Sequence, residues 1–300
     1  MVQNCLRQLL GEIVMLEKRS YTFWLITPAA IVYGVFFLLP TVVSFFFSLT
    51  RWDLVNWEFV GLENFRLFFS ARALSVGFSN TVLYAFLTSG GKVVFGLLLG
   101  MFLCIPLKTR GFLRAMVFFP TLISMVAVGV TFRSLMHPSR GLINTALGFF
   151  GIAGPDWLGS PDLALFSVII VDIWRGVGIA TVIFIAGIMS IPAQYYEALS
   201  IDGGGRWAKF RNITLPLCRP AINTVIILSF ISGLRHFELI WAMTRGGPGF
   251  SSDVISSIIY RQYAAGFYGV STAGNVLLFL GVAVLAVPLY FFLNRKEVDL

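Results

Sequence analysis

Long runs of apolar residues dominate this sequence and leave few folds open to it. Six of them are long enough to cross a bilayer as a helix, which takes about 20 apolar residues: Phe23–Leu49, Asn80–Ile105, Phe112–Phe132, Leu163–Met189, Leu217–Leu239 and Val270–Leu293. Only 12% of the residues are charged, against about 25% in soluble domains. Backbone groups in lipid must find partners within their own segment. The sequence therefore predicts an all-α membrane protein with six transmembrane helices.

The distribution of lysine and arginine predicts the orientation of these helices. With the N-terminus inside the cell, twelve basic residues fall on cytoplasmic segments and eight on outer segments. Basic residues collect on cytoplasmic loops, so we expect an N-in, C-in topology. The predicted parts are cytoplasmic segments 1–22 and 294–300, a transmembrane domain 23–293, and external loops 50–79 and 133–162. The net charge of +8 is then a membrane signal, and we expect no nucleic-acid partner.

Cysteine and histidine are too few and too scattered to indicate a metal site. Cys5, Cys104 and Cys218 share no short spacing, and the only histidines are His137 and His236. Zinc sites and disulfide frameworks need closely spaced cysteines or histidines. We therefore expect no bound metal.

One polar stretch, YYEALSIDGGGRWAKFRNITLPLCRP (195–220), stands between two apolar runs on the predicted cytoplasmic side. Asp202 and the three glycines after it divide the stretch into two short helical pieces. Trp207 and Phe210 fall on one side, as an apolar ridge that a partner's groove could accept. The alternative is an interfacial helix held by lipid headgroups, and the residues alone leave both interpretations open.

Two helical faces within the predicted spans carry polar residues, which are costly in lipid and usually face a cavity. At helical spacing these faces are Asp172, Arg175, Gly176 and Ile179, and then Ser229, Gly233 and His236. Structural alternatives exist for each face. Asp172 and Arg175 could form an ion pair with each other, and Ser229 could bond to its own helix. Lys92 could pack against a helix-end carbonyl or an acidic partner.

The polar stretch resembles the cytoplasmic motif of permeases of ATP-binding-cassette (ABC) importers. That pattern is Glu-Ala-Ala, three residues, Gly, nine residues, Ile, one residue and Leu-Pro. Its spacing is met by Glu197, Ala198, Gly203, Ile213, Leu215 and Pro216, with Leu199 in place of the second alanine. Pieces such as FVGLENF (59–65), RAMVFFPTLIS (114–124) and FELIWAMTRGGPG (237–249) extend the resemblance over nearly the whole chain. They are similar to the sugar branch, of the maltose and glycerol phosphate type.

This resemblance implies a type I ABC importer permease fold in the cytoplasmic (inner) membrane of a bacterium or archaeon. The function implied is import of a sugar or oligosaccharide by alternating access. The partners implied are a second homologous permease subunit, a dimer of ATPase subunits and an external solute-binding protein. The chain lacks the phosphate-binding motif G-x-x-x-x-G-K-[ST], so ATP and Mg would be used by the ATPase. We expect the chain to be non-catalytic and to bind no cofactor.

The resemblance also implies roles for particular residues. A coupling helix at about 193–214 would sit in a cleft of the ATPase, through Glu197, Ala198, Asp202, Gly203, Trp207, Phe210, Ile213, Leu215 and Pro216. Because the pattern requires Gly203, Gly204→Ala is expected to be milder than Gly203→Val. The external loop 133–162 and TRGGPGFSSD (244–253) are where contact with the binding protein is expected.

The two polar faces coincide with sugar-contacting positions of the family, so they are expected to line a mid-membrane substrate site. Asp172 and His236 would bind hydroxyls, and Arg175 a hydroxyl or a carboxylate. An acidic saccharide is one option, and an importer of the sn-glycerol 3-phosphate type is the alternative. An ion-coupled secondary transporter would need inverted repeats or discontinuous helices, and a membrane enzyme a convergent catalytic set. The sequence shows neither.

Overall fold

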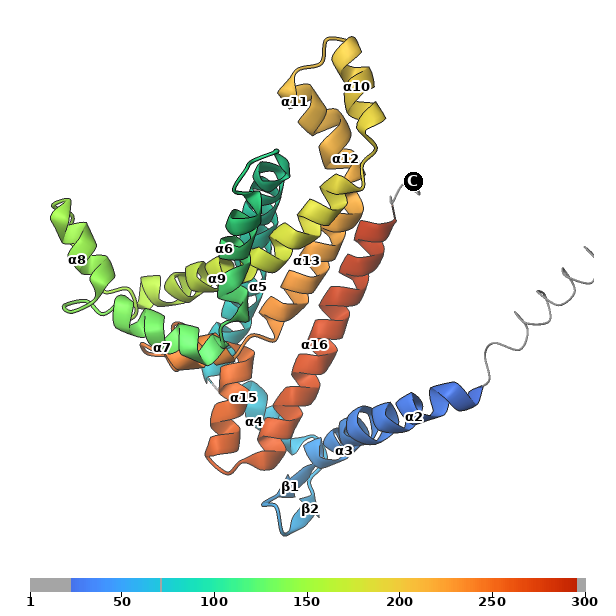
Figure 1. Ribbon diagram of the computed structural model, residues 1–300. Helices are drawn as coiled ribbons and strands as arrows, with labels where there is room; N and C mark the ends of the chain where they lie inside the picture. The colour runs from blue at the N-terminus through green and yellow to red at the C-terminus, as the bar shows by residue number, and fades with distance from the viewer. Residues whose placement is uncertain (1–22, 71, 296–300) are drawn as a thin grey trace, which may run out of the picture.

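The computed structural model describes residues 23–70 and 72–295, and the predicted segment 1–22 and most of 294–300 lie outside them. Helices make up most of this part of the chain (Figure 1). The elements in order are α2 (Phe23–Tyr33), η1 (Gly34–Leu38), α3 (Leu39–Ser48), β1 (Thr50–Trp52), β2 (Trp57–Phe59), α4 (Glu63–Ser70), α5 (Arg72–Cys104), α6 (Arg110–Leu122), α7 (Met125–Leu135), α8 (Leu142–Phe149), α9 (Pro161–Met189), α10 (Ala193–Ile201), α11 (Arg206–Lys209), η2 (Phe210–Thr214), α12 (Leu215–Leu217), α13 (Arg219–Leu234), α14 (Glu238–Met243), α15 (Ile255–Ala264) and α16 (Tyr268–Asn294).

Four helices of the described part are long and apolar enough to cross a membrane: Ile26–Ser48, Leu74–Cys104, Pro161–Met189 and Tyr268–Asn294. Two further candidate spans are bent pairs. Helices α6 and α7 meet at 96°, and the segment Arg206–Leu217 meets α13 at 63°. Counting each bent pair as one span gives up to six.

The apolar run Phe112–Phe132, predicted as one helix, is divided into two, because α6 ends at Leu122 and α7 starts at Met125. Pro120 lies in the last turn of α6, and Ile123 then adopts an extended backbone conformation. The span predicted at Leu217–Leu239 is also divided, since α13 ends at Leu234 and α14 begins after a short turn. The apolar runs therefore contain two helix breaks that hydropathy did not predict.

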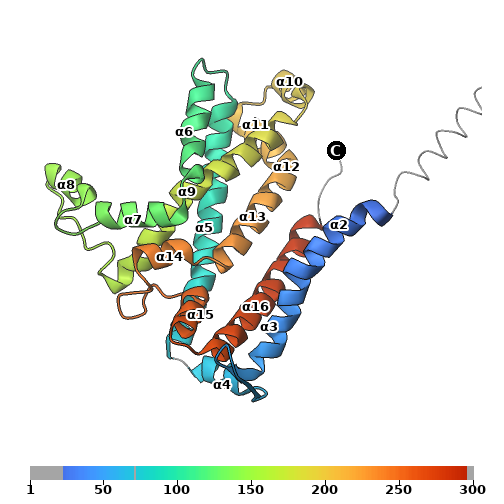
Figure 2. The ribbon, with the colours of Figure 1, turned by 60° about the horizontal axis from the view of Figure 1, so that its bottom comes forward.

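Helices α5 and α9 form the centre of the bundle, with α13 packed on α5 and α6 on α9 (Figure 2). Small residues allow this contact. A Cβ at Gly96 would stand 2.7 Å from the Cβ of Ala180, and one at Gly100 would stand 2.9 Å from that of Phe184. Small residues let membrane helices approach closely. The two helices that bear the polar faces, α9 and α13, are therefore closely packed against α5.

A short antiparallel hairpin closes the opposite end of the molecule from α10 and α11 (Figure 1). Strands β1 and β2 pair Thr50 with Phe59 and Trp52 with Trp57. Asn64 of α4 holds the hairpin, since its Nδ2 donates to the carbonyls of Ser48 at 2.9 Å and Thr50 at 2.8 Å.

Candidate functional site

The two predicted polar faces meet around two adjoining cavities. The first has a volume of about 170 Å³ and takes its polar lining from Lys92, Asp172, Arg175, Ser229 and Ser232, with Gly176 and Ile179 beside them. The second, of about 420 Å³, is lined by Arg235, His236, Phe237 and Glu238 among others. Met125, Leu228 and Ser232 line both cavities. Six of the seven predicted residues therefore lie on one of the two cavities.

Asp172 is held by Lys92 of α5 and forms no ion pair with Arg175. Nζ of Lys92 donates to Oδ2 of Asp172 at 2.7 Å, and the two side chains are 9% and 3% exposed. Gly176 makes room for this contact, since a Cβ there would stand 2.5 Å from Cε of Lys92. The Asp172–Arg175 alternative is therefore wrong, and the acidic partner considered for Lys92 is Asp172. Each charge of the buried pair needs the other, because an unpaired charge is costly there.

Arg175 extends from α9 to the break between α6 and α7. Its Nε donates to the carbonyl of Ile123 at 3.1 Å, and its Nη2 donates to the carbonyls of Thr121 at 3.2 Å and Ile123 at 3.1 Å. In return, Oγ1 of Thr121 donates to the carbonyl of Arg175 at 2.9 Å. The last carbonyls of a helix have no partner within the helix, so Arg175 supplies donors where α6 ends.

Ser229 bonds within α13 and across to α5. Its Oγ donates to the carbonyl of Val225, which is the back-bonding alternative. It also shares a hydrogen bond of 2.9 Å with Oγ of Ser89. Gly233 lies off the cavity lining and packs against α5, since a Cβ there would stand 2.7 Å from Cα of Ala85. Gly233 therefore acts through helix packing.

His236 lies in the turn that follows α13 and is 5% exposed. Its ring stacks on that of Tyr84, with 5.0 Å between the centroids. Its Nε2 has no hydrogen-bond partner among residues 23–70 and 72–295. In the same residues, no group of three or more His, Cys, Asp or Glu side chains is placed to hold a metal ion.

The polar stretch forms two short helices, α10 and α11, that stand beyond one end of the bundle (Figure 1). Gly203 lies in the turn between them with φ +77° and open space around it. This is the left-handed region that glycine occupies without strain. Gly204 has no such space, because a Cβ there would stand 2.5 Å from Cγ and 2.8 Å from the carbonyl oxygen of Leu199. Valine at Gly203 would strain the backbone at this positive φ, and alanine at Gly204 would press on Leu199, so the structure gives a reason against each change.

The predicted coupling residues divide into an exposed set and an anchored set. Trp207 is 69% exposed, and its ring contacts that of Phe210 at 5.4 Å between centroids. Phe210 packs against the core of α5, α9 and α13, and Ile213 is buried in a second cluster below the turn. The exposed set comprises Glu197, Ala198, Asp202, Gly203, Trp207, Leu215 and Pro216. One side of the stretch thus packs against the helix bundle, and the other side is exposed.

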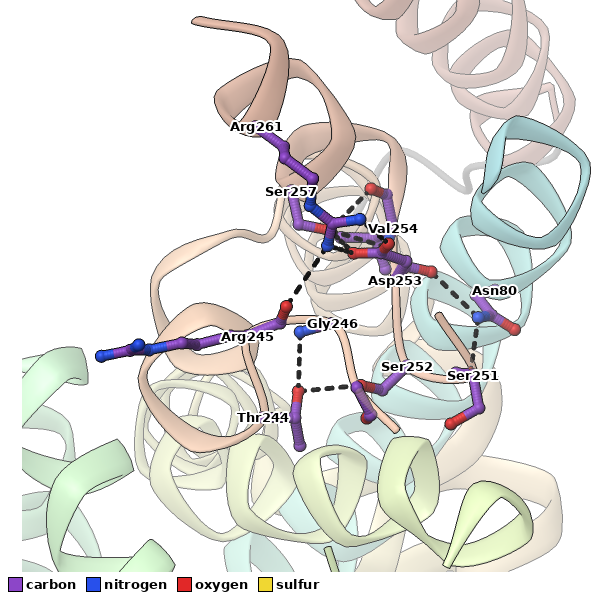
Figure 3. A network of polar contacts seen from close by, with 11 residues as sticks. Asn80, Thr244, Arg245, Gly246, Ser251, Ser252, Asp253, Val254, Ser257 and Arg261 are labelled. Atoms are coloured by element: carbon purple, nitrogen blue, oxygen red, sulfur yellow. Dashed lines mark hydrogen bonds and ion pairs between the residues drawn. The ribbon is translucent and has the colours of Figure 1, made fainter. Parts of the chain in front are cut away.

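A polar network that the sequence did not reveal fixes the loop 244–253 (Figure 3). The buried carboxylate of Asp253 pairs with Arg261 through two contacts of 3.0 Å and accepts a bond of 2.7 Å from Ser257. Burial raises the pKa of Asp253, although the bonds from Ser257 and Arg261 act to lower it. Asn80 of α5 donates to the carbonyls of Ser251 and Asp253 at 2.8 and 2.9 Å. The loop is thus held from α5 and α15, and no periodic pattern could have predicted this.

Several helices are long enough to span a membrane, a polar cavity lies between them, and a polar segment lies beyond one end. These features define the class, a multi-span membrane protein. A family model described as "Binding-protein-dependent transport system inner membrane component" matches residues 92–297. The chain belongs to this family. It is therefore an inner-membrane component of a binding-protein-dependent transport system, and the predicted kinship with ABC importer permeases is confirmed.

Several named relatives resemble the chain over most of its length. The trehalose/maltose transport system permease protein MalF of Thermococcus litoralis is 34% identical over 261 residues, covering 86% of this chain and 88% of that protein. The multiple sugar-binding transport system permease protein MsmF of Streptococcus mutans is 30% identical over 282 residues, covering 92% and 95%. The sulfoquinovosyl glycerol transport system permease protein SmoG of Agrobacterium fabrum is 30% identical over 250 residues, covering 82% and 81%.

Solved structures place the fold. A chain from the crystal structure of a bacterial ABC transporter that imports the acidic polysaccharide alginate has a TM-score of 0.81 at 23% identity, covering 97% of this chain and 100% of that one. A chain from the alginate transporter in complex with alginate pentasaccharide-bound periplasmic protein has a TM-score of 0.77 at 24% identity, covering 93% and 94%. The fold is that of ABC importer permeases.

Proposed function

We propose that this chain is the transmembrane permease subunit of an ABC importer that moves a sugar or oligosaccharide into the cell by alternating access. The observation that carries the proposal is the family match over 92–297 together with relatives whose names specify trehalose, maltose or other sugars. A cargo of the sn-glycerol 3-phosphate type is the alternative. An ion-coupled secondary transporter is disfavoured by membership of a binding-protein-dependent family. The sequence disfavoured such a transporter because it showed neither inverted repeats nor discontinuous helices. The bent pairs are discontinuous helices, so that part of the argument no longer holds.

The proposed topology has six spans with both termini in the cytoplasm, each bent pair counted as one span. This orientation places α10 and α11 in the cytoplasm and the loops 50–79 and 133–162 outside. The basic residues that favour it include Arg206 and Lys209 on α11, as cytoplasmic segments are enriched in such residues. The segments 1–22 and 294–300 are then cytoplasmic.

The proposed partner of α10 and α11 is a separate ATPase subunit, present as a dimer that uses ATP and Mg. The exposed side chains of Glu197, Asp202 and Trp207 would enter its cleft, while Ile213 and Phe210 would carry the movement into the bundle. This division into an open side and an anchored side supports a coupling role. The chain itself would bind no cofactor and catalyse no reaction.

The proposed cargo site is the pair of adjoining cavities. Ser229, Gly176 and Ile179 face the first cavity and His236 faces the second. A second homologous permease would complete the passage across from them. The proposed contacts for the solute-binding protein are the hydrogen-bonded loop 244–253 and the external loop 133–162.

The experiment is reconstitution of the chain with its second permease, ATPase and binding protein, followed by measurement of ATP hydrolysis with a panel of ligands. Matched neutral and acidic saccharides and glycerol 3-phosphate would be compared at equal concentration. Stimulation by a saccharide supports the proposal, and stimulation by glycerol 3-phosphate alone would replace it with the alternative. The chain alone should hydrolyse no ATP.

A further inference from the structure

The break between α6 and α7 leaves backbone groups that need partners inside the membrane. Ile123 and Ser124 are not helical, and the two helices diverge by 96° (Figure 2). Carbonyls without donors are costly at this depth. The carbonyls of Thr121 and Ile123 both receive hydrogen bonds from one side chain, that of Arg175.

The geometry of this contact suits arginine in particular. A guanidinium group is planar and presents fixed donors that can serve two neighbouring oxygens, whereas a lysine ammonium is a single point. Arg175 forms no ion pair with any residue in 23–70 or 72–295. Helix α9 also lies very close to α6, since a Cβ at Gly178 would stand 2.7 Å from the carbonyl oxygen of Val117. One turn of α9 is therefore closely joined to the end of α6.

The residue directly after the break is Met125, the first residue of α7. Met125 lines both cavities, together with Leu228 and Ser232 of α13. Met125 therefore lies at the junction of the two cavities, which these three residues line and which we call the neck. A residue that fixes the bend between α6 and α7 therefore also fixes the α7 side of this neck.

We infer that Arg175 is a positioning residue that clamps the α6–α7 bend and so holds Met125 at the neck between the two cavities. Two of its three guanidinium nitrogens are committed to backbone carbonyls. Arg175 thus acts on cargo through Met125, in place of the cargo-binding role that its place on the polar face suggested. The inference about the neck rests on the structure alone, and only its transport readout rests on the proposed function.

The first test measures the neck without any cargo. Met125→Cys is introduced into the full complex, and its rate of reaction with a maleimide is compared with Arg175 intact, Arg175→Gln and Arg175→Lys. The chain without Met125→Cys gives the background from its own cysteines. We expect Arg175→Gln to change the rate by about threefold or more, because losing hydrogen bonds from a charged group shifts the population of the bent state. Arg175→Lys should fall between.

The matched control is Arg133→Gln, which removes an exposed arginine from α7 without touching the clamp. It should leave the labelling rate unchanged. Equal rates in Arg175→Gln and the intact chain, or equal changes in Arg175→Gln and Arg133→Gln, would overturn the inference. If Arg175→Gln does not assemble, Arg175→Lys decides in the same way, with an unchanged rate counting against the clamp.

The second test separates positioning from cargo binding. In saccharide uptake, a loosened neck should lower the maximal rate of Arg175→Gln and leave its KM nearly unchanged, with partial rescue by lysine. A large rise in KM with normal cargo-free labelling would make Arg175 a cargo ligand and overturn the inference. Failure of the intact complex to take up any saccharide would count against the proposed function only, because the labelling test needs no cargo.

Discussion

Lys92 and Asp172 are two charges that α5 and α9 bury against each other, 2.7 Å apart. Such a pair gains little over a well-packed apolar pair, but removing one partner leaves a buried charge without compensation. Its structural importance is therefore expected to show when only one of the two residues is changed.

We predict that Lys92→Met or Asp172→Leu alone lowers the free energy of unfolding by about 3–5 kcal/mol, and that the double variant is much closer to the intact protein. Thermal unfolding of the purified chain in detergent measures this. Losses that simply add in the double variant would show that the two charges do not depend on each other.

Ser229 offers a cleaner probe of the cargo site than Asp172, because its hydroxyl lines the cavity and carries no charge. We predict that Ser229→Ala raises the KM for saccharide uptake or alters selectivity, while Asp172→Ala impairs both folding and uptake. The matched control is Thr181→Val on α9, whose hydroxyl bonds to its own helix away from the cavity lining. Full uptake with unchanged specificity in both cavity variants would contradict the assignment of this face.

At this scale the sequence predicted which residues share a helix face, and it could not predict their partners. Periodicity placed Asp172 and Arg175 together because both lie on α9. Their actual partners, Lys92 and the carbonyls of Thr121 and Ile123, come from α5 and from the end of α6. Contacts between helices depend on how the helices pack, and the pattern of one helix carries no information about that.

At the scale of elements, the turn between α10 and α11 shows how one side chain limits its neighbour. The side chain of Leu199 leaves no room for a side chain at Gly204. Leu199 stands where the family pattern has alanine, and its larger side chain fills the space over Gly204. One contact therefore accounts for two features of the sequence: leucine at 199 in place of the pattern's alanine, and glycine at 204 after the glycine that the pattern requires.

We predict that Gly204→Ala costs about 1–3 kcal/mol through overpacking and weakens coupling of ATP hydrolysis to uptake. Leu199→Ala combined with Gly204→Ala should recover part of the coupling, because it removes the side-chain contact and leaves the one with the carbonyl oxygen of Leu199. Gly205→Ala is the control, because nothing lies within 4 Å of a Cβ there. The explanation fails if Gly204→Ala behaves like Gly205→Ala in stimulated ATP hydrolysis.

The positions of the spans followed from the apolar runs, whereas the 96° break at Ile123–Ser124 did not. Apolar composition continues across the break, so hydropathy gives no signal there, and Pro120 alone does not distinguish a kink from a helix end. The turn at Asp202–Gly205 was predictable, since consecutive glycines favour bends.

Taken as a whole molecule, the chain leaves large surfaces without partners in the described part. In the most apolar part of Ile26–Ser48 no residue is buried. In the most apolar part of Tyr268–Asn294 only 11% of the residues are buried. Lipid and the proposed second permease would cover these faces. The sequence predicted the class of fold and the family because several motifs occur in order. It did not predict which surface binds which partner chain, because such surfaces follow no periodic pattern.

The most direct test of the central proposal is uptake of labelled saccharide into proteoliposomes that hold the assembled complex and its binding protein. The prediction is accumulation that requires ATP and the separate ATPase, and that is uncoupled from ATP hydrolysis by Gly203→Val. Accumulation driven by an ion gradient without the ATPase, or unaltered coupling in Gly203→Val, would contradict it.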